Sequence, residues 1–384
     1  MNKYIVKGFR KINNSYRRYK NDNWEIAYFR NLSETIIDMF NMYHSQSYHY
    51  IHKHAQPKNV YHYHDDRNII LLNDVYVWPQ TSLVAIDKNT LIKDSAYSNH
   101  RFKQFVEDIQ FNKQHVLHEN EPCAAIECGQ WNNYYHWYID TISRLYGLYH
   151  PKIQRIKNVK LYISDDLPEE RLMVLNHLIP SNVEIKFFYG QCKLKAKTYI
   201  HLPYLTSEWT GHLPQDYLDF YKKSISSLFN LSYNNKKKIN IYISRKYASV
   251  RNILNENLLF PILQRNGFGV YYLENMRLRD QVELFMHADC ILGQHGAGLT
   301  NMIYSKDANI IEIFSTNYPG VNHYRLLASS LNFNYGNIHA DKIFRPDELQ
   351  VPWKTPYKID HINKDIEVDV EKIEEKILQI KNYN

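Results

Sequence analysis

The stretch CILGQHGAGLTNMIYSKDANIIEIF, residues 290–314, decides the fold that this sequence specifies. It contains two short apolar runs, CILGQ and NIIEIF, separated by the turn HGAG and the apolar segment LTNMIYS. Short, mainly apolar runs are typical of strands in a parallel sheet covered on both faces, and the segment between them predicts a helix. The stretch therefore predicts strand, turn, helix and strand in that order.

The same alternation continues on both sides of this stretch. Nearby we predict the strands INIYISR and GVYYLE and helices at 253–266, 277–288, 323–332 and 367–383. Earlier in the chain, NIILLNDVYVW, TSLVAID, CAAIECG, KLYISD, VEIKFFY and AKTYIHL predict strands, with helices at 134–150 and 168–179. We therefore expect an α/β protein with two α/β halves.

The length of 384 residues suits two domains better than one hydrophobic core. We expect an N-terminal α/β domain at 66–231 and a C-terminal α/β domain with a terminal helix at 232–384. The polar run SYNNKKK at 232–238 reads as a linker or loop. Residues 1–65 are expected to be irregular, basic and rich in His and Tyr, with weak helical periodicity at 24–42.

Charge and cysteine content exclude several classes of protein. The net charge is +7 and, beyond the N-terminus, basic residues alternate with acidic ones, unlike the charged stripe of a nucleic-acid-binding protein. The four cysteines have no zinc-site spacing, and no run approaches the ~18 apolar residues of a membrane span. We expect a cytoplasmic protein with neither a metal site nor a nucleic-acid partner.

The first 20 residues form a basic arm. It holds no acidic side chain and carries Lys3, Lys7, Arg10, Lys11, Arg17, Arg18 and Lys20. Such an arm either frays in solvent or lies on an anionic membrane surface, so peripheral membrane contact stays open.

Three glycines, Gly293, Gly296 and Gly298, surround the point where the strand CILGQ ends. Ligands of open parallel sheets bind beyond the carboxyl ends of the strands, and glycines let backbone amides approach a ligand closely. The next helix N-terminus favours a phosphate or pyrophosphate, to which His295 and Thr300 would add donors. The segment is neither a Walker loop nor a G-x-G-x-x-G pattern, and a tight turn without a ligand is the alternative.

Two arginines follow another predicted strand. In IYISRKYASVRNILNEN (241–257), Arg245 comes directly after the strand and Arg251 six residues later. Guanidinium groups bind phosphates in a bidentate manner, so this pair suits the mouth of a diphosphate site. Two solvated surface arginines are the alternative.

A third segment, NYYHWYIDTISRL (133–145), carries titratable residues at helical spacing. His136, Asp140 and Arg144 would lie along one face of a helix. A carboxylate one turn from an imidazole raises its basicity and fixes its tautomer, which makes the pair a candidate general base. A surface ion pair between Asp140 and Arg144 is the alternative.

Together these segments resemble glycosyltransferase family 61. The residues that carry the resemblance are NYYHWYIDTISRL, SRKYASVRNILNE, the Gln281 helix DQVELFMHAD, and GQHGAGLTNMIY followed by NIIEIF. They occur in the family's order and span roughly residues 120–320. One departure is Ser143, which stands where the family often has a Pro.

The resemblance implies a GT-B-like fold, in which two Rossmann-like domains face a cleft and the C-terminal one holds the donor nucleotide. It implies an inverting, metal-independent hexosyl or pentosyl transfer, usually from a UDP-sugar, to a hydroxyl of a glycan or glycoconjugate, as in polysaccharide biosynthesis. No further cofactor is implied. The absence of any Asp-x-Asp triplet agrees with metal independence.

The resemblance also assigns residues. Asp140 and His136 would be catalytic and face the cleft, with Arg144 in support and the identity of the base left open. Glu312 would lie near the ribose. The residues expected to bind the nucleotide sugar are Ser244, Arg245, Arg251, Gly293, His295, Gly296, Ala297, Gly298, Thr300, Asn301 and Glu312.

Two other functions stay open. One is a sugar-nucleotide epimerase or a phosphotransferase on the same architecture, although an epimerase of this kind needs an early G-x-G-x-x-G, which is missing. The other is a non-catalytic pseudoenzyme that binds nucleotides or glycans. A product assay separates the pseudoenzyme from a transferase.

Overall fold

The computed structural model describes residues 25–27, 36–37, 69–87, 90–92, 95–97, 115–206, 210–233, 238–315, 322–340, 342–344 and 365–381. The basic arm lies outside these residues. The chain divides into two compact units, Met1–Glu208 and Trp209–Asn384, whereas the sequence predicted a boundary after residue 231. Helix α6 (Gln215–Phe229) accounts for the difference, because its buried Tyr221 stacks on Tyr304 of the second unit.

A mixed sheet forms the core of the first unit. Its strand order is β1-β5-β4-β3-β10-β7-β8-β9, with β2 paired to β3 and β6 paired to β10. Strands β7, β8 and β9 run parallel with β10, whereas β3 is antiparallel to both β10 and β4. The predicted parallel α/β part is therefore joined by an antiparallel part. The strands are β1 (Glu25–Ala27), β2 (Ile36–Ile37), β3 (Ile69–Trp78), β4 (Leu83–Ala85), β5 (Thr90–Ile92), β6 (His115–Glu119), β7 (Cys123–Ala125), β8 (Val159–Ser164), β9 (Val183–Phe188) and β10 (Cys192–His201).

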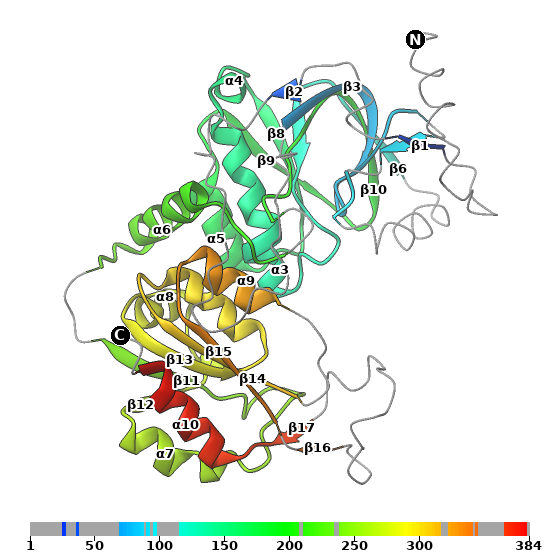
Figure 1. Cartoon of the computed structure of the whole chain (residues 1–384). Helices are drawn as coiled ribbons and strands as arrows, with labels where there is room; N and C mark the ends of the chain where they lie inside the picture. The colour runs from blue at the N-terminus through cyan, green and yellow to red at the C-terminus, as the bar shows by residue number, and fades with distance from the viewer. Residues whose placement is uncertain are drawn as a thin grey trace. The chain divides into compact units, whose positions relative to one another are not determined.

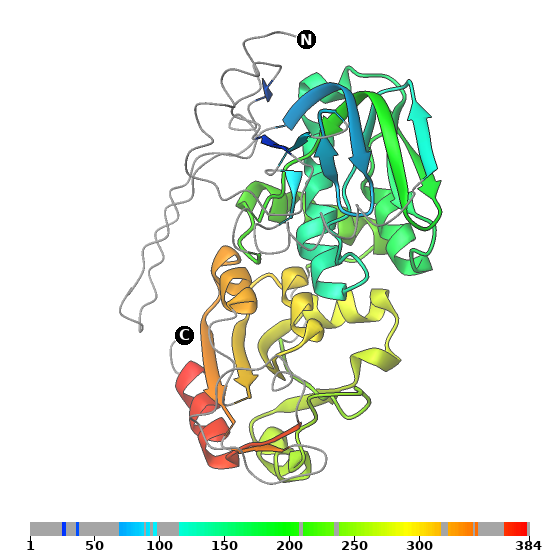
Figure 2. The same cartoon turned by 90° about the vertical axis from the view of Figure 1, so that its right-hand side faces the viewer.

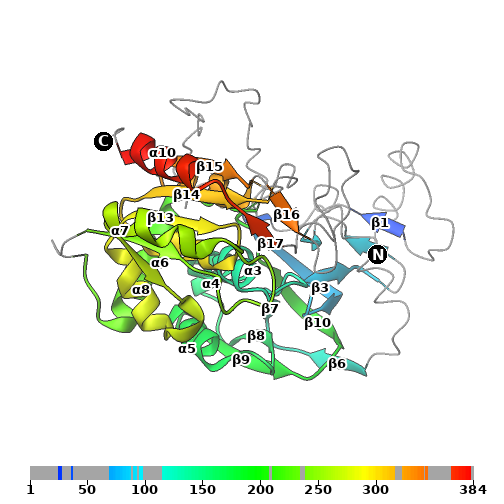
Figure 3. The ribbon, with the colours of Figure 1, turned by 90° about the horizontal axis from the view of Figure 1, so that it is seen from below.

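Helical segments connect the parallel strands of this unit. Helix α5 (Glu169–Leu178) joins β8 to β9, and Figure 3 shows it beside β9. The sequence predicted one helix over 134–150. The structure instead has three consecutive helical segments of different type before α4 (Pro151–Gln154). They are the α-helix α3 (Tyr134–His136), the π-helix η4 (Trp137–Thr141) and the 3-10 helix η5 (Ile142–Tyr149). Within the stretch 24–42, for which weak helical periodicity was noted, the described residues 25–27 and 36–37 are the strands β1 and β2, which pair with β5 and β3; the rest of the stretch lies outside the described residues.

A parallel sheet of order β12-β11-β13-β14-β15 forms the core of the second unit (Figure 1). The predicted strands are confirmed as β11 (Ile239–Ile243), β12 (Phe268–Tyr271), β13 (Ala288–Gln294) and β14 (Asn309–Phe314); β15 (Tyr335–His339) was not predicted. All six residues of β14 are buried, as expected of a strand covered on both faces.

Helices cover both faces of this sheet. In Figure 1, α7 (Phe260–Arg265) and α10 (Val370–Lys381) lie on one face, and α8 (Leu278–Met286) and α9 (His323–Ser330) on the other. Helix α10 was predicted as an amphipathic helix and buries Ile373, Ile377 and Ile380 in the core. Figure 2 shows this helix, in red, beside the orange strand of the sheet.

Local sequence explains where the helices of the second unit depart from prediction. Helix α7 is shorter than expected because Pro261 stands in its first turn, where the missing N–H is tolerated. The residues before it include the 3-10 turn η6 (Glu256–Leu258), and a second turn, η7, covers Leu273–Asn275. The helix after HGAG is the 3-10 helix η8 (Ala297–Tyr304), and β16 (Lys342–Phe344) pairs with β17 (Asp365–Glu367). In the described part of the chain, no helix combines the length and apolarity that a membrane span requires.

Candidate functional site

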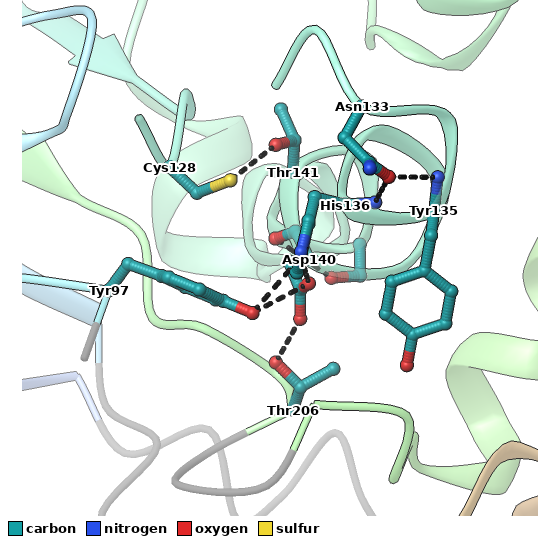
Figure 4. Close-up of polar contacts among 9 residues, drawn as sticks. Tyr97, Cys128, Asn133, Tyr135, His136, Asp140, Thr141 and Thr206 are labelled. Atoms are coloured by element: carbon teal, nitrogen blue, oxygen red, sulfur yellow. Dashed lines mark hydrogen bonds and ion pairs between the residues drawn. The ribbon is translucent and has the colours of Figure 1, made fainter. Parts of the chain in front are cut away.

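Four side chains of the first unit form a hydrogen-bonded network around Asp140 (Figure 4). The carboxylate of Asp140 is fully buried. Its Oδ2 lies 2.7 Å from Nδ1 of His136 and accepts a 2.9 Å hydrogen bond from the hydroxyl of Tyr97. Its Oδ1 accepts a 2.7 Å hydrogen bond from the hydroxyl of Thr206. The structure thus brings together the pair His136 and Asp140, which the sequence singled out.

Local helical geometry accounts for this meeting. The side chain of Asn133 caps α3, since its Oδ1 accepts hydrogen bonds from the backbone N–H groups of Tyr135 and His136 at 2.9 and 3.4 Å. The following turn is a π-helix, closed by the N–H of Ile142 donating to the carbonyl of Trp137. Such turns are rare in proteins and frequent at functional sites. This π-helix, η4, lies between α3 and η5, and it carries Asp140.

Arg144 takes a different direction from the one that regular helical spacing predicts. Its buried guanidinium donates to the carbonyls of Leu202 and Ile126 and to the hydroxyl of Ser82 over 2.6 to 2.9 Å. It also lies 4.1 Å from the ring centroid of Tyr204. Among the described residues it forms no ion pair with Asp140, so the surface-pair alternative is wrong. Arg144 supports the site indirectly, because it ties η5 to the segments that follow β7 and β10.

Sequence reasoning missed two members of the network, Tyr97 and Thr206. They lie 43 and 66 residues from Asp140 along the chain and belong to no motif. The ring of Tyr97 packs edge-on against the rings of His136 and Tyr204, with centroid separations of 5.7 and 5.3 Å. Only their hydrogen bonds to Asp140 in the folded structure identify these two residues.

The network gives His136 and Asp140 unequal chemical roles. Both oxygens of Asp140 already accept hydrogen bonds from protein hydroxyl groups. Because Asp140 is an acceptor, the proton of a neutral His136 is assigned to Nδ1, which leaves the lone pair on Nε2. The side chain of His136 is 14% exposed and that of Asp140 is 0% exposed. The arrangement can therefore take a proton at Nε2 of His136.

The predicted donor-site residues of the second unit gather where β11, β13 and β14 end. The order β12-β11-β13-β14-β15 means that the chain leaves β11 toward one side of the sheet and leaves β13 toward the other. This is a topological switch point, where open α/β sheets bind ligands in the crevice beyond the carboxyl ends of the strands. Ser244 and Arg245 follow β11, and His295 follows β13.

Arg245, Arg251 and Gly296 are in direct contact at this switch point. The guanidinium of Arg245 donates to the carbonyls of Val250 (2.9 Å) and Arg251 (3.3 Å), which closes the loop between the two arginines. Nη1 of Arg251 donates to the carbonyl of His295 at 3.2 Å. A Cβ atom at Gly296 would overlap Nη1 of Arg245. Glycine at 296 therefore makes room for the guanidinium.

The backbone of Arg251 has a φ of 63°, in the left-handed region that non-glycine residues seldom adopt. Such a conformation persists where the surrounding structure demands it, and it occurs often at binding sites. Burial, followed by the neighbouring Arg251, lowers the pKa of Arg245 below its usual value. Two adjacent guanidinium groups repel each other, and an anion between or beside them would relieve that repulsion.

His295 is held by a second carboxylate. Its Nδ1 lies 2.5 Å from Oε1 of Glu312, whose Oε2 accepts a 2.6 Å hydrogen bond from the hydroxyl of Tyr335. The ring of His295 also stacks on Phe314, with a centroid separation of 5.4 Å. Glu312 is 1% exposed, and both of its oxygens have protein partners. The observed contacts of Glu312 orient His295, whereas the family resemblance implied that Glu312 lies near the ribose.

The remaining predicted residues are packed against other residues of the second unit. Cβ atoms at Gly293 and Gly298 would meet Ile243 at 3.3 and 3.2 Å, so close packing explains these two glycines where the sequence suggested ligand approach. Asn301 is buried and donates to Oε1 of Gln281 at 2.7 Å. Of the other predicted residues, Ser244 and Thr300 are fully buried, and Ala297 begins η8.

A comparison with protein families identifies a family for the part of the chain that holds these residues. Residues 134–311 match the model of the family described as Glycosyltransferase 61. The match begins two residues before His136 and ends one residue before Glu312, so it includes Asp140 and the switch point but neither Tyr97 nor Tyr335. No curated protein matches the chain.

Proposed function

Residues 134–311 belong to glycosyltransferase family 61, and on that basis we propose that this glycosyltransferase moves a sugar from a UDP-sugar to a hydroxyl of a glycan or glycoconjugate. The proposed reaction inverts the anomeric configuration and uses no metal ion. We place it in cytoplasmic polysaccharide biosynthesis, with a GT-B arrangement in which the first unit supplies the base and the second holds the donor.

The observation that carries the proposal is the contact between His136 and Asp140. In the proposed reaction, Nε2 of His136 removes the proton of the acceptor hydroxyl. The buried carboxylate of Asp140 holds the ring and stabilises the imidazolium that forms. Tyr97 and Thr206 hold the carboxylate in turn. General-base catalysis by a positioned side chain contributes typically about 10²–10⁴-fold in rate.

The switch-point cluster supplies the charge for the leaving group. The acceptor oxygen forms a bond to the anomeric carbon as the bond from that carbon to the β-phosphate oxygen breaks. UDP departs with the electron pair of the broken bond. The guanidinium groups of Arg245 and Arg251, together with His295, are the donors we assign to this developing charge. Losing one such donor typically costs about 3 kcal/mol in transition-state stabilisation.

The test is UDP release from a panel of UDP-sugars and glycan acceptors, with and without EDTA. We expect one donor to turn over in EDTA, with loss of turnover in His136→Ala and loss of UDP affinity in Arg245→Ala. His177→Ala is the matched control, because His177 lies exposed on α5. Wild-type turnover by His136→Ala would remove the proposed base. UDP binding without turnover of any donor would favour the pseudoenzyme, and abolition by EDTA would overturn metal independence.

A further inference from the structure

A cavity of about 830 Å³ lies in the second unit, away from the switch-point cluster. Part of its wall comes from α6, and part from residues that precede strands: Lys306 and Asp307 before β14, and Asn332 and Phe333 before β15. Residues that precede parallel strands lie at the amino ends of the sheet. Arg245 and His295 follow strands and lie at the carboxyl ends, so the cavity is separate from the proposed donor site.

Three lysines give the cavity its charge: Lys222 and Lys223 from α6, and Lys306 after η8. Lys222 is half-buried, and its Nζ lies 5.6 Å from the ring centroid of Phe333. No group in the described part of the chain accepts a hydrogen bond from its ammonium. Burial lowers the pKa of Lys222 to about 8, although the nearby Asp219 partly opposes the shift. A partly desolvated ammonium without an acceptor is costly, and a bound anion would offset that cost.

The acidic residues of the wall have hydrogen-bond partners other than the three lysines. The carboxylate of Asp219 accepts a 2.7 Å hydrogen bond from the amide of Gln215, and that of Asp307 lies 3.3 Å from Nζ of Lys238. Neither forms an ion pair with a cavity lysine among the described residues. The cavity therefore presents a net positive surface to a ligand.

The rest of the wall suits a sugar ring. Phe333 and Tyr233 are the aromatic residues of the wall, and the hydroxyl of Tyr233 is fixed by donating to the carbonyl of Tyr304 at 2.8 Å. Asn332 and Ser226 add an amide and a hydroxyl. Apolar faces with a few placed polar groups are typical of small-molecule sites, and cations select an anionic substituent.

We propose that this cavity binds a sugar that carries a phosphate or carboxylate group, at a site distinct from the donor site. The ammonium of Lys222 contacts the anionic group, Lys223 and Lys306 stand at the rim, and the sugar lies against Phe333. The affinity falls as the pH rises above about 8, because Lys222 then loses its charge. The inference does not depend on sugar transfer.

The test is competitive amine labelling of the full chain at pH 7.5, followed by mass spectrometry. Glucose 1-phosphate and glucuronate are the probes, while inorganic phosphate and UDP are compared at equal ionic strength. We expect the probes to slow acetylation of Lys222 in a saturable manner, by about tenfold at ten times Kd. In Lys222→Met the same probes no longer protect Lys306, whereas Lys152→Met, on the exposed surface of α4, leaves the protection unchanged.

Three outcomes would overturn the proposal. One is no protection at probe concentrations up to about 10 mM, well above a millimolar Kd. Another is equal slowing of all lysines by inorganic phosphate and the probes, which would mean an ionic-strength effect only. The third is protection by UDP but not by the sugar anions, which would make the cavity a nucleotide site. Failure of UDP binding or of transfer would count against the proposed function and leave this labelling result intact.

Discussion

Nδ1 of His136 lies 2.7 Å from Oδ2 of Asp140, and the carboxylate is closed off from solvent while the imidazole side chain is 14% exposed. The exposed partner is the one that can meet a substrate, and the buried one can act only through it. This relationship assigns the proton transfer to His136 and the positioning to Asp140. It also makes the hydrogen bonds to Asp140 a further target for mutation.

Asp140→Asn should reduce turnover by about 10²–10⁴-fold with little change in UDP affinity. The neutral amide carries no negative charge, so it cannot stabilise the imidazolium that forms when His136 takes the proton. Steady-state rates and UDP titration of the same preparation measure the two quantities. A variant that loses UDP affinity in proportion to turnover would point to a damaged fold.

Tyr97→Phe and Thr206→Val each remove one hydrogen bond to the Asp140 carboxylate. A hydrogen bond to a charged group contributes about 1.5–3 kcal/mol, so we expect kcat to fall by roughly tenfold or more while KM for the donor is unchanged. An unchanged kcat in both variants would show that neither residue positions the base. Tyr189→Phe is the control, because Tyr189 is exposed.

Gly296→Ala should weaken UDP binding by displacing the Arg245 guanidinium, because the added methyl group overlaps Nη1. We expect a Kd about tenfold higher, a loss of about 1.4 kcal/mol. The same change in an Arg245→Ala background should cost little further affinity, since the atom that clashes is gone. This double-mutant cycle separates displacement of Arg245 from general distortion of the turn. Additive losses would contradict the displacement.

Tyr335→Phe should make the position of Glu312, and therefore that of His295, less well fixed. The phenol donates to Oε2 of Glu312, and the other carboxylate oxygen contacts His295. If His295 helps hold the diphosphate, the variant should raise the Kd for UDP several-fold without changing the melting temperature of the first unit. Glu312→Gln should have a larger effect, because it removes the charge that faces Nδ1. Unchanged UDP affinity in both variants would separate His295 from nucleotide binding.

Glu127 predicts a pH dependence of stability. Burial raises its pKa from the ordinary 4.5 to about 8, an effect partly opposed by the N–H of Ser164, which donates to Oε1 at 2.7 Å. The folded state therefore keeps a proton that the unfolded state has lost between about pH 4.5 and 8. The stability contribution of the neutral acid is complete below 4.5 and is lost as the pH rises to about 8.

The slope approaches 1.4 kcal/mol per pH unit for one proton. Glu127→Gln should lower this slope and stabilise the first unit at pH 8, as measured by denaturant titrations at pH 5, 6.5 and 8. If the free energy of unfolding changed with pH by the same amount in the wild type and in Glu127→Gln, Glu127 would ionise normally.

Much of the fold was predictable from local pattern. Strands β11, β13 and β14 of the second unit are short and mainly apolar, which is the composition typical of a parallel strand buried on both faces. The antiparallel part of the first unit was not predicted, because strand direction depends on which distant strand lies beside β3. The helix over 134–150 was also misjudged, since its apolar spacing does not distinguish an α-helix from the π and 3-10 turns that tertiary packing imposes there.

The sequence by itself determined the residue types and their order: His136 and Asp140 four apart, two arginines after one strand, and a glycine-rich turn after another. Motif and spacing are local, so they can be read before the chain folds. Only the tertiary structure decided the strand order that places Arg245 and His295 at one switch point. It alone brought Tyr97 and Thr206 onto Asp140 and turned Arg144 away from it. These contacts join residues far apart in the chain, and packing in three dimensions is what selects them.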